Sequence, residues 1–183
     1  MSDPTVAARG SRPPLPRDCE QRTLGVAFLD LSRMAEWSSP AEDERVAAFL
    51  QEFYALVAQC LEPAGAQIVK FMGDAGLAMF PEDAAEQVAL ALADLARQAR
   101  AAGAEHGLDV YLNANVHVGP ALVGSFGAPG HERTDVIGKT VNIAARLGRR
   151  GITLSQQAYR CLSPSGRKRF EKVTQPTTYR LRL

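Results

Sequence analysis

The chain has 183 residues, enough for one compact domain with a substantial core and too few for two ordinary domains. Apolar residues make up 46% of it and charged residues 22%, which excludes a disordered, collagenous or disulfide-scaffold protein. Its 21 basic and 20 acidic side chains leave a formal charge of +1, so no global field recruits nucleic acid or an acidic membrane.

Residues 1–22 are expected to be a flexible lead, because they contain four prolines, interspersed arginines and no apolar block of the length a secretory signal requires. The folded domain is expected over residues 23–183. No stretch of about 18 consecutive apolar residues occurs, so no membrane-spanning helix and hence a soluble protein are predicted.

The cysteines and histidines are scattered along the chain. Three cysteines without a CxxC pair favour reduced thiols and a cytoplasmic location over a disulfide or zinc framework. No two histidines have the i, i+4 spacing of a zinc site on a helix, so any metal is expected to have oxygen ligands. These residues are Cys19, Cys60, Cys161, His106, His117 and His131.

The first half of the chain predicts a strand, a helix and a hairpin. Residues 23–30, TLGVAFLD, form an apolar run that delivers Asp30 to the end of a buried strand. A helix opens at Ser38, Ser39 and Pro40, shows apolar residues at three- and four-residue steps, and ends before Pro63 and Gly65. Residues 66–80 form two apolar arms around a Gly73-Asp74 turn.

The second half predicts a further long helix and several shorter elements. The long helix runs from Pro81 to about Ala102, with Gly103 behind it. Residues 109–118 alternate as a half-buried strand with Asn113, Asn115 and His117 on its polar face, and residues 120–126 return as its partner. A helix over 138–148, a strand over 151–155, a helix over 155–162 and a terminal strand over 177–183 follow.

This order predicts the α+β class: a ferredoxin-like βαββαβ core with additional αβ elements. The helices are expected on one face of a mostly antiparallel sheet.

Asp30 and Asp74 are separated by 44 positions (74 − 30), yet both fall at the ends of strands that this topology makes neighbours. Two adjacent carboxylates repel each other unless a cation lies between them, and carboxylate oxygens suit Mg²⁺. The pair therefore indicates a Mg²⁺ nucleotide site. The alternative is ordinary loop chemistry, since Asp is common at strand ends and in turns.

Lys70 lies within an apolar hairpin arm, and Asp135 lies just before an apolar pair. Lys70 could extend along the sheet edge to water. Alternatively, its ammonium donates to ring nitrogens of a purine while Asp135 accepts from an exocyclic amine, a combination that suits adenine.

Asn142 and Arg146 are four residues apart and share one helix face. They are either solvated, or an amide that orients a ribose and a guanidinium that stabilises charge on a transferring phosphorus. Gly119, Gly124 and Gly127 are interpreted as turn and close-approach positions, because their spacing matches neither the Walker A nor the Rossmann motif.

Three segments in this order, FLDLSRM, KFMGDAGLAMF and DVIGKTVNIAAR, resemble the catalytic domain of class III nucleotidyl cyclases. The resemblance covers roughly residues 22–183. It implies the cyclase fold, which agrees with the elements above, and a homodimer with active sites at the subunit interface.

The resemblance also implies roles for individual residues. Asp30 and Asp74 match the aspartates that hold two Mg²⁺ or Mn²⁺ ions, and Leu31 matches the residue whose carbonyl reaches a metal. Lys70 and Asp135 match the pair that recognises adenine, where guanylate-forming members carry Glu and Cys.

Further roles follow from the same resemblance. Asn142 matches the ribose-orienting residue and Arg146 the transition-state arginine. A late lysine is expected on the triphosphate, with Lys172 the first candidate and Lys168 the second. In the family the metal aspartates come from one subunit and the other four residues from its partner.

Two departures from the family pattern concern the region near the phosphates. Arg33 and Met34 stand where the family usually has Gly-Phe, and Lys139 replaces a commonly acidic or small polar residue. The expected function is that of an adenylate cyclase. One alternative is a cyclase for GTP or a pyrimidine nucleotide. The other is a domain that binds nucleotide without turnover, but this chain retains all six family positions, which argues against it. They are Asp30, Asp74, Lys70, Asp135, Asn142 and Arg146.

Overall fold

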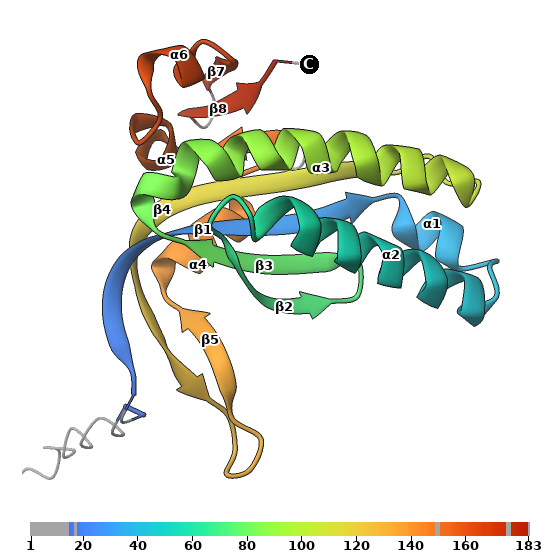
Figure 1. Cartoon of the computed structure of the whole chain (residues 1–183), viewed down its shortest axis with the longest axis horizontal. Coiled ribbons are helices and arrows are strands. Elements are labelled where there is room, and N and C mark those ends of the chain that lie inside the picture. The colour runs from blue at the N-terminus through green and yellow to red at the C-terminus, as the bar shows by residue number, and fades with distance from the viewer. Residues whose placement is uncertain (1–14, 17, 149–150, 175–176, 183) are drawn as a thin grey trace, which may run out of the picture.

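A single mixed sheet forms the centre of the computed structural model, with helices packed against both of its faces (Figure 1). The structure describes residues 15–16, 18–148, 151–174 and 177–182. Within them the strands are β1 (Glu20–Ser32), β2 (Gln67–Met72), β3 (Ala75–Phe80), β4 (Tyr111–Phe126), β5 (Arg133–Ile137), β6 (Ile152–Leu154), β7 (Phe170–Thr174) and β8 (Thr177–Leu181). The helices are α1 (Met34–Ser38), α2 (Asp43–Leu61), the short 3₁₀ helix η1 (Glu82–Ala84), α3 (Ala85–Glu105), α4 (Lys139–Arg146), α5 (Gln156–Arg160) and α6 (Pro164–Arg167).

The strand order β2-β3-β1-β4-β6-β8-β7, with β5 paired to the far part of β4, confirms the predicted α+β fold. The β4–β6 pair is parallel and the other pairs are antiparallel. The hairpin β2–β3 turns at Gly73 and Asp74 as predicted.

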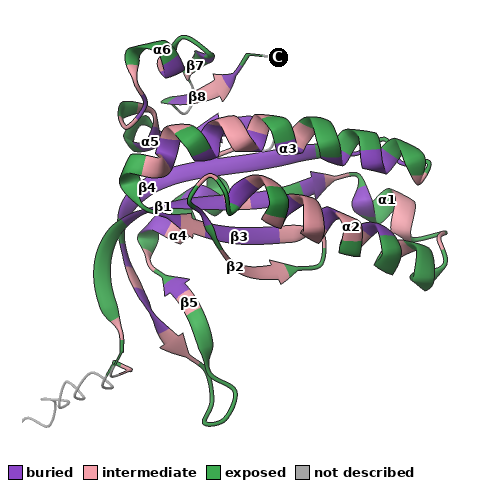
Figure 2. Ribbon diagram, viewed as in Figure 1, coloured by how far each residue is buried: buried purple, intermediate pink, exposed green. Residues whose placement is uncertain are grey.

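The central strands β1 and β4 are buried on both faces, as Figure 2 shows. On β1, Ala27 and Leu29 face the main core under α2 and α3, whereas Leu24 and Val26 belong to a second cluster with Ala144 of α4. The expectation that all helices lie on one face is therefore wrong. Successive residues of a strand point to opposite faces of the sheet, so a strand that is apolar throughout needs a covering layer on each face. Helix α4 covers the face opposite to α2 and α3.

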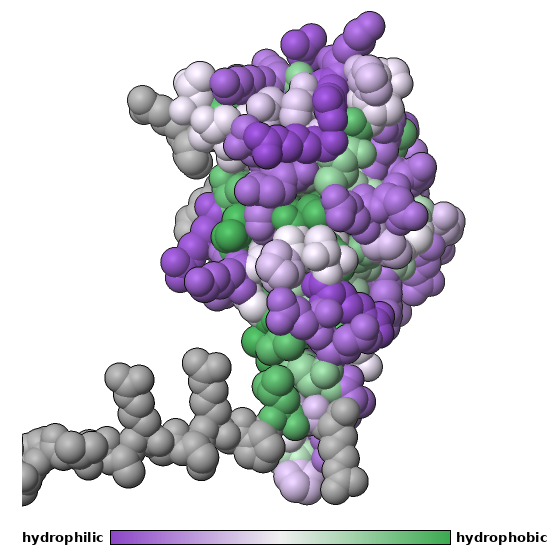
Figure 3. Space-filling view, turned by 90° about the vertical axis from the view of Figure 1, so that its left-hand side faces the viewer, coloured by the Kyte–Doolittle hydropathy of each residue, from purple (hydrophilic) through white to green (hydrophobic). Residues whose placement is uncertain are grey.

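Strand β4 differs most from its prediction. It continues without interruption from Tyr111 to Phe126, so residues 120–126 extend the strand instead of returning beside it. This stretch pairs with the start of β1 on one side and with β5 on the other, and β4 and β5 form an arm that projects from the body (Figure 1). Hydrophobic residues gather near the arm in Figure 3, and Ile137 at the end of β5 is 46% exposed.

The bounds of several elements also differ from the predictions. The helix expected to open at Ser38, Ser39 and Pro40 is α2, which begins at Asp43. Helix α1, which ends at Ser38, was not predicted, and α3 runs past Gly103 to Glu105. Strand β7 was not predicted.

At the N-terminus, β1 begins at Glu20, and the Ser125 amide donates to Asp18 Oδ2 at 3.0 Å. Most of the predicted lead, residues 1–14 and 17, lies outside the described residues. Within the described part of the chain, no helix is long and apolar enough to cross a membrane.

Candidate nucleotide-binding site

The two predicted metal-binding aspartates lie at the same edge of the sheet. Asp30 pairs with Ala75 in the β1–β3 register, and Asp74 is the residue just before Ala75 in the hairpin turn. The Leu31 amide donates to the Asp74 carbonyl oxygen at 3.2 Å, which joins the two segments directly. Asp30 is exposed and Asp74 half-buried, so both carboxylates can reach a ligand in solvent.

Helix α2 supports the turn that carries Asp74. The Tyr54 hydroxyl donates to the Gly73 carbonyl oxygen at 2.7 Å, and the Tyr54 ring stacks on Phe71 with centroids 4.1 Å apart. Gly73 has φ +64°, a left-handed conformation that glycine adopts at little cost. The position of Asp74 is therefore set by α2 as well as by the β2–β3 hairpin.

Lys70 and Asp135 come together from β2 and β5, although 65 positions separate them. Lys70 Nζ lies 2.6 Å from Asp135 Oδ2, and the side chains are 28% and 17% exposed. Asp135 Oδ1 also accepts from the Val136 amide at 2.8 Å. The ammonium of Lys70 is thus paired with a carboxylate instead of extending alone into solvent, and the pair presents one donor and one acceptor group side by side.

Asn142 and Arg146 lie on exposed turns of α4. The helix is anchored on its other side by buried Ala144 and by Thr140, whose hydroxyl donates to the Pro120 carbonyl oxygen at 2.7 Å. A Cβ at Gly119 would lie 2.8 Å from Thr140 Oγ1, so the close-approach role predicted for Gly119 is confirmed.

The lysines expected on the triphosphate lie apart from these groups. Lys172 is exposed on β7, the opposite edge strand of the sheet from β2, which carries Lys70. Lys168 follows α6 and is also exposed. One chain therefore brings Asp30 close to Asp74 and Lys70 close to Asp135. Lys172 lies on the far side of the sheet from both pairs.

Two asparagines that position the segment after α4 were not recognised from the sequence. Asn113 and Asn115, expected on a polar face, are 7% and 5% exposed. Asn115 Nδ2 donates to the Gly148 carbonyl oxygen at 2.8 Å, and Asn113 Oδ1 accepts from the Gly151 amide at 3.0 Å. They therefore fix Gly148, two residues after Arg146, and Gly151, just before β6. Their sequence pattern gives no sign of burial, because polar residues that alternate with apolar ones are typical of a half-exposed strand.

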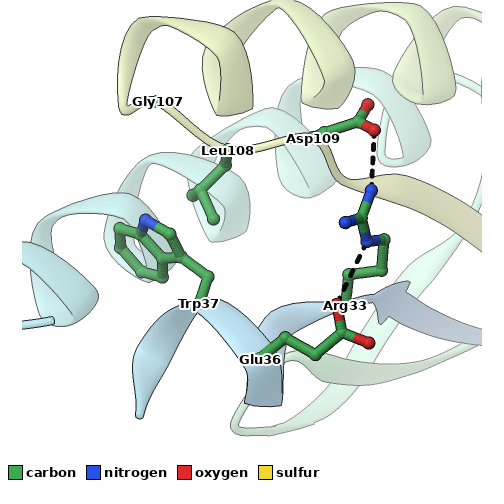
Figure 4. A pocket seen from close by; sticks show the side chains of 6 residues that line it. All are labelled: Arg33, Glu36, Trp37, Gly107, Leu108 and Asp109. Carbon is green, nitrogen blue, oxygen red and sulfur yellow. Dashed lines mark hydrogen bonds and ion pairs between the residues drawn. The ribbon is translucent and has the colours of Figure 1, made fainter. Parts of the chain in front are cut away.

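Arg33 adopts a backbone conformation that favours glycine, with φ +67°. Its guanidinium lies 2.8 Å from Asp109 and 3.3 Å from Glu36, and these residues line a cavity of about 370 Å³ together with Trp37 and Leu108 (Figure 4). The hydrogen bond to Glu36 and the charges of Glu36 and Asp109 raise the pKa of Arg33. The charge of Arg33, one of the departures from the family pattern, is thus paired with two carboxylates beside α1.

The adenylate and guanylate cyclase catalytic domain is the family whose model matches residues 19–180. Among curated proteins, an uncharacterised protein of Mycobacterium tuberculosis is 33% identical over 151 residues, which cover 78% of this chain and 26% of the relative. An adenylate cyclase of Anabaena cylindrica is 26% identical over 171 residues, covering 88% and 33%. Adenylate cyclase 1 of Rhizobium meliloti is 30% identical over 137 residues, covering 70% and 20%. This chain spans about a quarter of the length of the mycobacterial relative.

Solved structures of cyclases share the fold. A bacterial light-regulated adenylyl cyclase superposes with a TM-score of 0.80 at 15% identity, over 90% of this chain and 53% of the other. The adenylyl cyclase CyaB from P. aeruginosa gives 0.75 at 17% identity, over 91% and 96%. The guanylyl cyclase Cya2 gives 0.71 at 20% identity, over 88% and 92%.

Proposed function

We propose that this chain, which belongs to the family of adenylate and guanylate cyclase catalytic domains, converts ATP into 3′,5′-cyclic AMP and pyrophosphate. The observation that carries the choice of ATP is the pairing of Lys70 with Asp135. A lysine ammonium donates to an adenine ring nitrogen, and a carboxylate accepts from the exocyclic amine. Guanine carries a carbonyl oxygen at that edge, which would face the Asp135 carboxylate without a proton between them.

Asp30 and Asp74 fit a divalent-cation site, since two carboxylates share one sheet edge. In the described part of the chain, no group of three or more His, Cys, Asp or Glu side chains could hold a metal. The Leu31 carbonyl, substrate phosphate oxygens and water would complete the coordination, as Mg²⁺ sites commonly require. Two bound Mg²⁺ or Mn²⁺ ions would neutralise triphosphate charge and lower the pKa of the ribose 3′-hydroxyl.

The remaining roles fall to side chains of α4. In the reaction, the 3′-oxygen forms a bond to the α-phosphorus as the bond to the pyrophosphate oxygen breaks, and the hydroxyl proton passes to solvent water. Asn142 orients the ribose, and the Arg146 guanidinium stabilises the negative charge that develops at the α-phosphorus. Both side chains are exposed on the helix, so a bound nucleotide can reach them.

We infer that the enzyme acts as a homodimer in which the aspartates of one subunit face α4 and the Lys70–Asp135 pair of the other. Large hydrophobic residues are exposed near these groups: Met72 at 43%, Ile137 at 46% and Ile143 at 42%. Exposed apolar residues grouped near functional side chains are typical of an interface. The proposed location is the cytoplasm, where the free thiols of the three cysteines would stay reduced.

A cyclase of different base preference is the second candidate, because guanylyl cyclases share this fold. The experiment that separates the candidates is incubation of the purified protein with each nucleoside triphosphate and Mn²⁺, followed by chromatography against cyclic nucleotide standards. We expect cyclic AMP as the main product, and loss of turnover in folded Asp30→Ala and Asp74→Ala. Nucleotide binding without any cyclic product would favour a non-catalytic domain instead.

A further inference from the structure

A second cavity lies between α3, the start of β4, β6 and the end of β8, with a volume of about 410 Å³. This volume is within the range of about 300 to 1,000 Å³ that small-molecule sites occupy. Apolar side chains from four elements line it: Ala93, Ala96, Leu112, Ile152 and Leu181. A ligand with an apolar body would therefore be sheltered from water there.

Four arginines line the cavity beside these apolar residues, and no Asp or Glu is among its lining residues. Arg97 and Arg100 come from α3, Arg169 precedes β7 and Arg182 follows β8. The Arg182 amide donates to the Arg169 carbonyl oxygen at 2.9 Å, which keeps these two residues adjacent. Like charges gathered at one opening repel each other, and an anion bound between them relieves the repulsion.

The arginines differ in how far their charge is already compensated. Arg97 pairs with Asp94 on its own helix. The Arg100 guanidinium lies 4.8 Å from the centre of the Tyr111 ring and 3.9 Å from Asp109. Within the described residues, neither Arg169 nor Arg182 takes part in a salt bridge. These two are the arginines that remain available to an incoming anion.

We propose that this cavity binds a small aromatic carboxylate. Guanidinium groups bind carboxylates through two parallel hydrogen bonds and stack on aromatic faces, so an arginine rim over an apolar floor suits both parts of such a molecule. None of the lining residues is among the residues assigned to the nucleotide site. The proposal is therefore independent of the proposed cyclase activity.

The test uses fluorescence anisotropy of 1-pyrenebutyrate, with the uncharged 1-pyrenebutanol as the matched probe. We expect saturable one-to-one binding of the acid, at least tenfold weaker binding of the alcohol, and no displacement by excess ATP. Arg169→Gln/Arg182→Gln should weaken binding of the acid at least tenfold. Arg133→Gln/Arg160→Gln, which removes the same charge outside the cavity, should leave binding unchanged.

A second variant, Ala96→Phe, fills the cavity and should abolish binding while circular dichroism reports an unchanged fold. The arginine variants alter only exposed side chains, so the test stands even if Ala96→Phe fails to fold. Absence of saturable binding to the unmodified chain, equal binding to both arginine double variants, or displacement of the probe by ATP would overturn the proposal.

Discussion

At the scale of single residues, the Lys70–Asp135 pair has the most direct consequence for specificity. Its two charged groups lie 2.6 Å apart in a half-buried setting, and Asp135 also accepts from the Val136 amide. A guanine base would place its carbonyl oxygen against the Asp135 carboxylate, and each acceptor buried without a donor costs about 1 to 3 kcal/mol. The pair can therefore discriminate between bases more strongly than an apolar pocket could.

We predict that Lys70→Glu combined with Asp135→Cys lowers kcat/KM for ATP far more than for GTP, roughly 10-fold to 100-fold, because donor and acceptor no longer match adenine. The measurement is kcat/KM for ATP, GTP, CTP and UTP in both proteins. Arg160→Glu serves as the control because this exposed residue ends α5 and has no role in the proposed nucleotide site. An unchanged ratio in the double variant would mean that these residues do not read the base.

The buried histidine of β4 predicts a pH dependence of stability. His117 is 5% exposed, with Nδ1 2.8 Å from Ser155 Oγ, and burial lowers its pKa in the folded protein. The unfolded chain binds the proton more readily, with a pKa near 6.5. Neutral His117 thus makes its full contribution to the free energy of unfolding above about pH 6.5. This contribution is lost as the pH falls towards the lowered pKa of the folded state.

Urea unfolding at about pH 7.5 and about pH 5 measures this loss of unfolding free energy. His117→Gln should reduce the difference between the two pH values, whatever it does to stability itself. His131→Gln, which alters an exposed ring, is the matched control. Equal pH dependence in His117→Gln and the unmodified protein would contradict the assignment.

At the scale of elements, the packing of α3 against β4 decides where the long helix ends. Gly103 is buried within α3, and a Cβ there would lie 2.5 Å from Val110 Cγ2. At Gly103 the main chain of α3 packs directly against Val110, and a side chain at this position would prevent that contact. The glycine is therefore required for packing inside the helix and does not end it. The left-handed residue that follows the helix is Gly107, with φ +75°.

We predict that Gly103→Ala destabilises the fold by roughly 1 to 2 kcal/mol, although alanine is the better helix former by about 1 kcal/mol. Thermal and urea unfolding provide the measurement. In a Val110→Ala background the same substitution should cost less, because the clashing methyl group is gone. Equal costs in the two backgrounds would rule out the steric explanation.

At the scale of the whole molecule, the distribution of site residues favours composite active sites. Lys172 lies on the sheet edge opposite to the hairpin that carries Asp74, and Asn142 and Arg146 are exposed on α4. A second copy of the chain would supply what one copy does not bring to the aspartates. In a symmetric dimer each subunit then contributes to two sites.

Mixing two inactive variants tests this arrangement. Asp30→Ala and Arg146→Ala should each be inactive alone, and exchange of subunits should restore one intact site in each heterodimer, giving up to about a quarter of the unmodified activity in an equal mixture. The matched control mixes Asp30→Ala with Asp74→Ala, which should recover nothing because both changes lie on the same half of the site. A lack of recovery with Arg146→Ala, despite demonstrated exchange, would favour a site within one chain.

The sequence by itself determined the fold class, the Gly73-Asp74 hairpin and the position of Asp30 at a strand end, because these depend on local patterns of apolar residues and turn chemistry. It also indicated the family, through three motifs in order. Local patterns report whether a residue is polar, but they do not report what packs against it.

The tertiary structure alone decided which polar residues are buried and what they hold. Asn113 and Asn115 alternate with apolar residues as a solvent-facing row would, yet α4 packs on that face of the sheet and their side chains form hydrogen bonds with Gly151 and Gly148. The 2.6 Å contact between Lys70 and Asp135 likewise arises only when β2 and the β4–β5 arm meet. Contacts between residues far apart in sequence depend on how the layers stack, and periodicity along one segment carries no information about its neighbours.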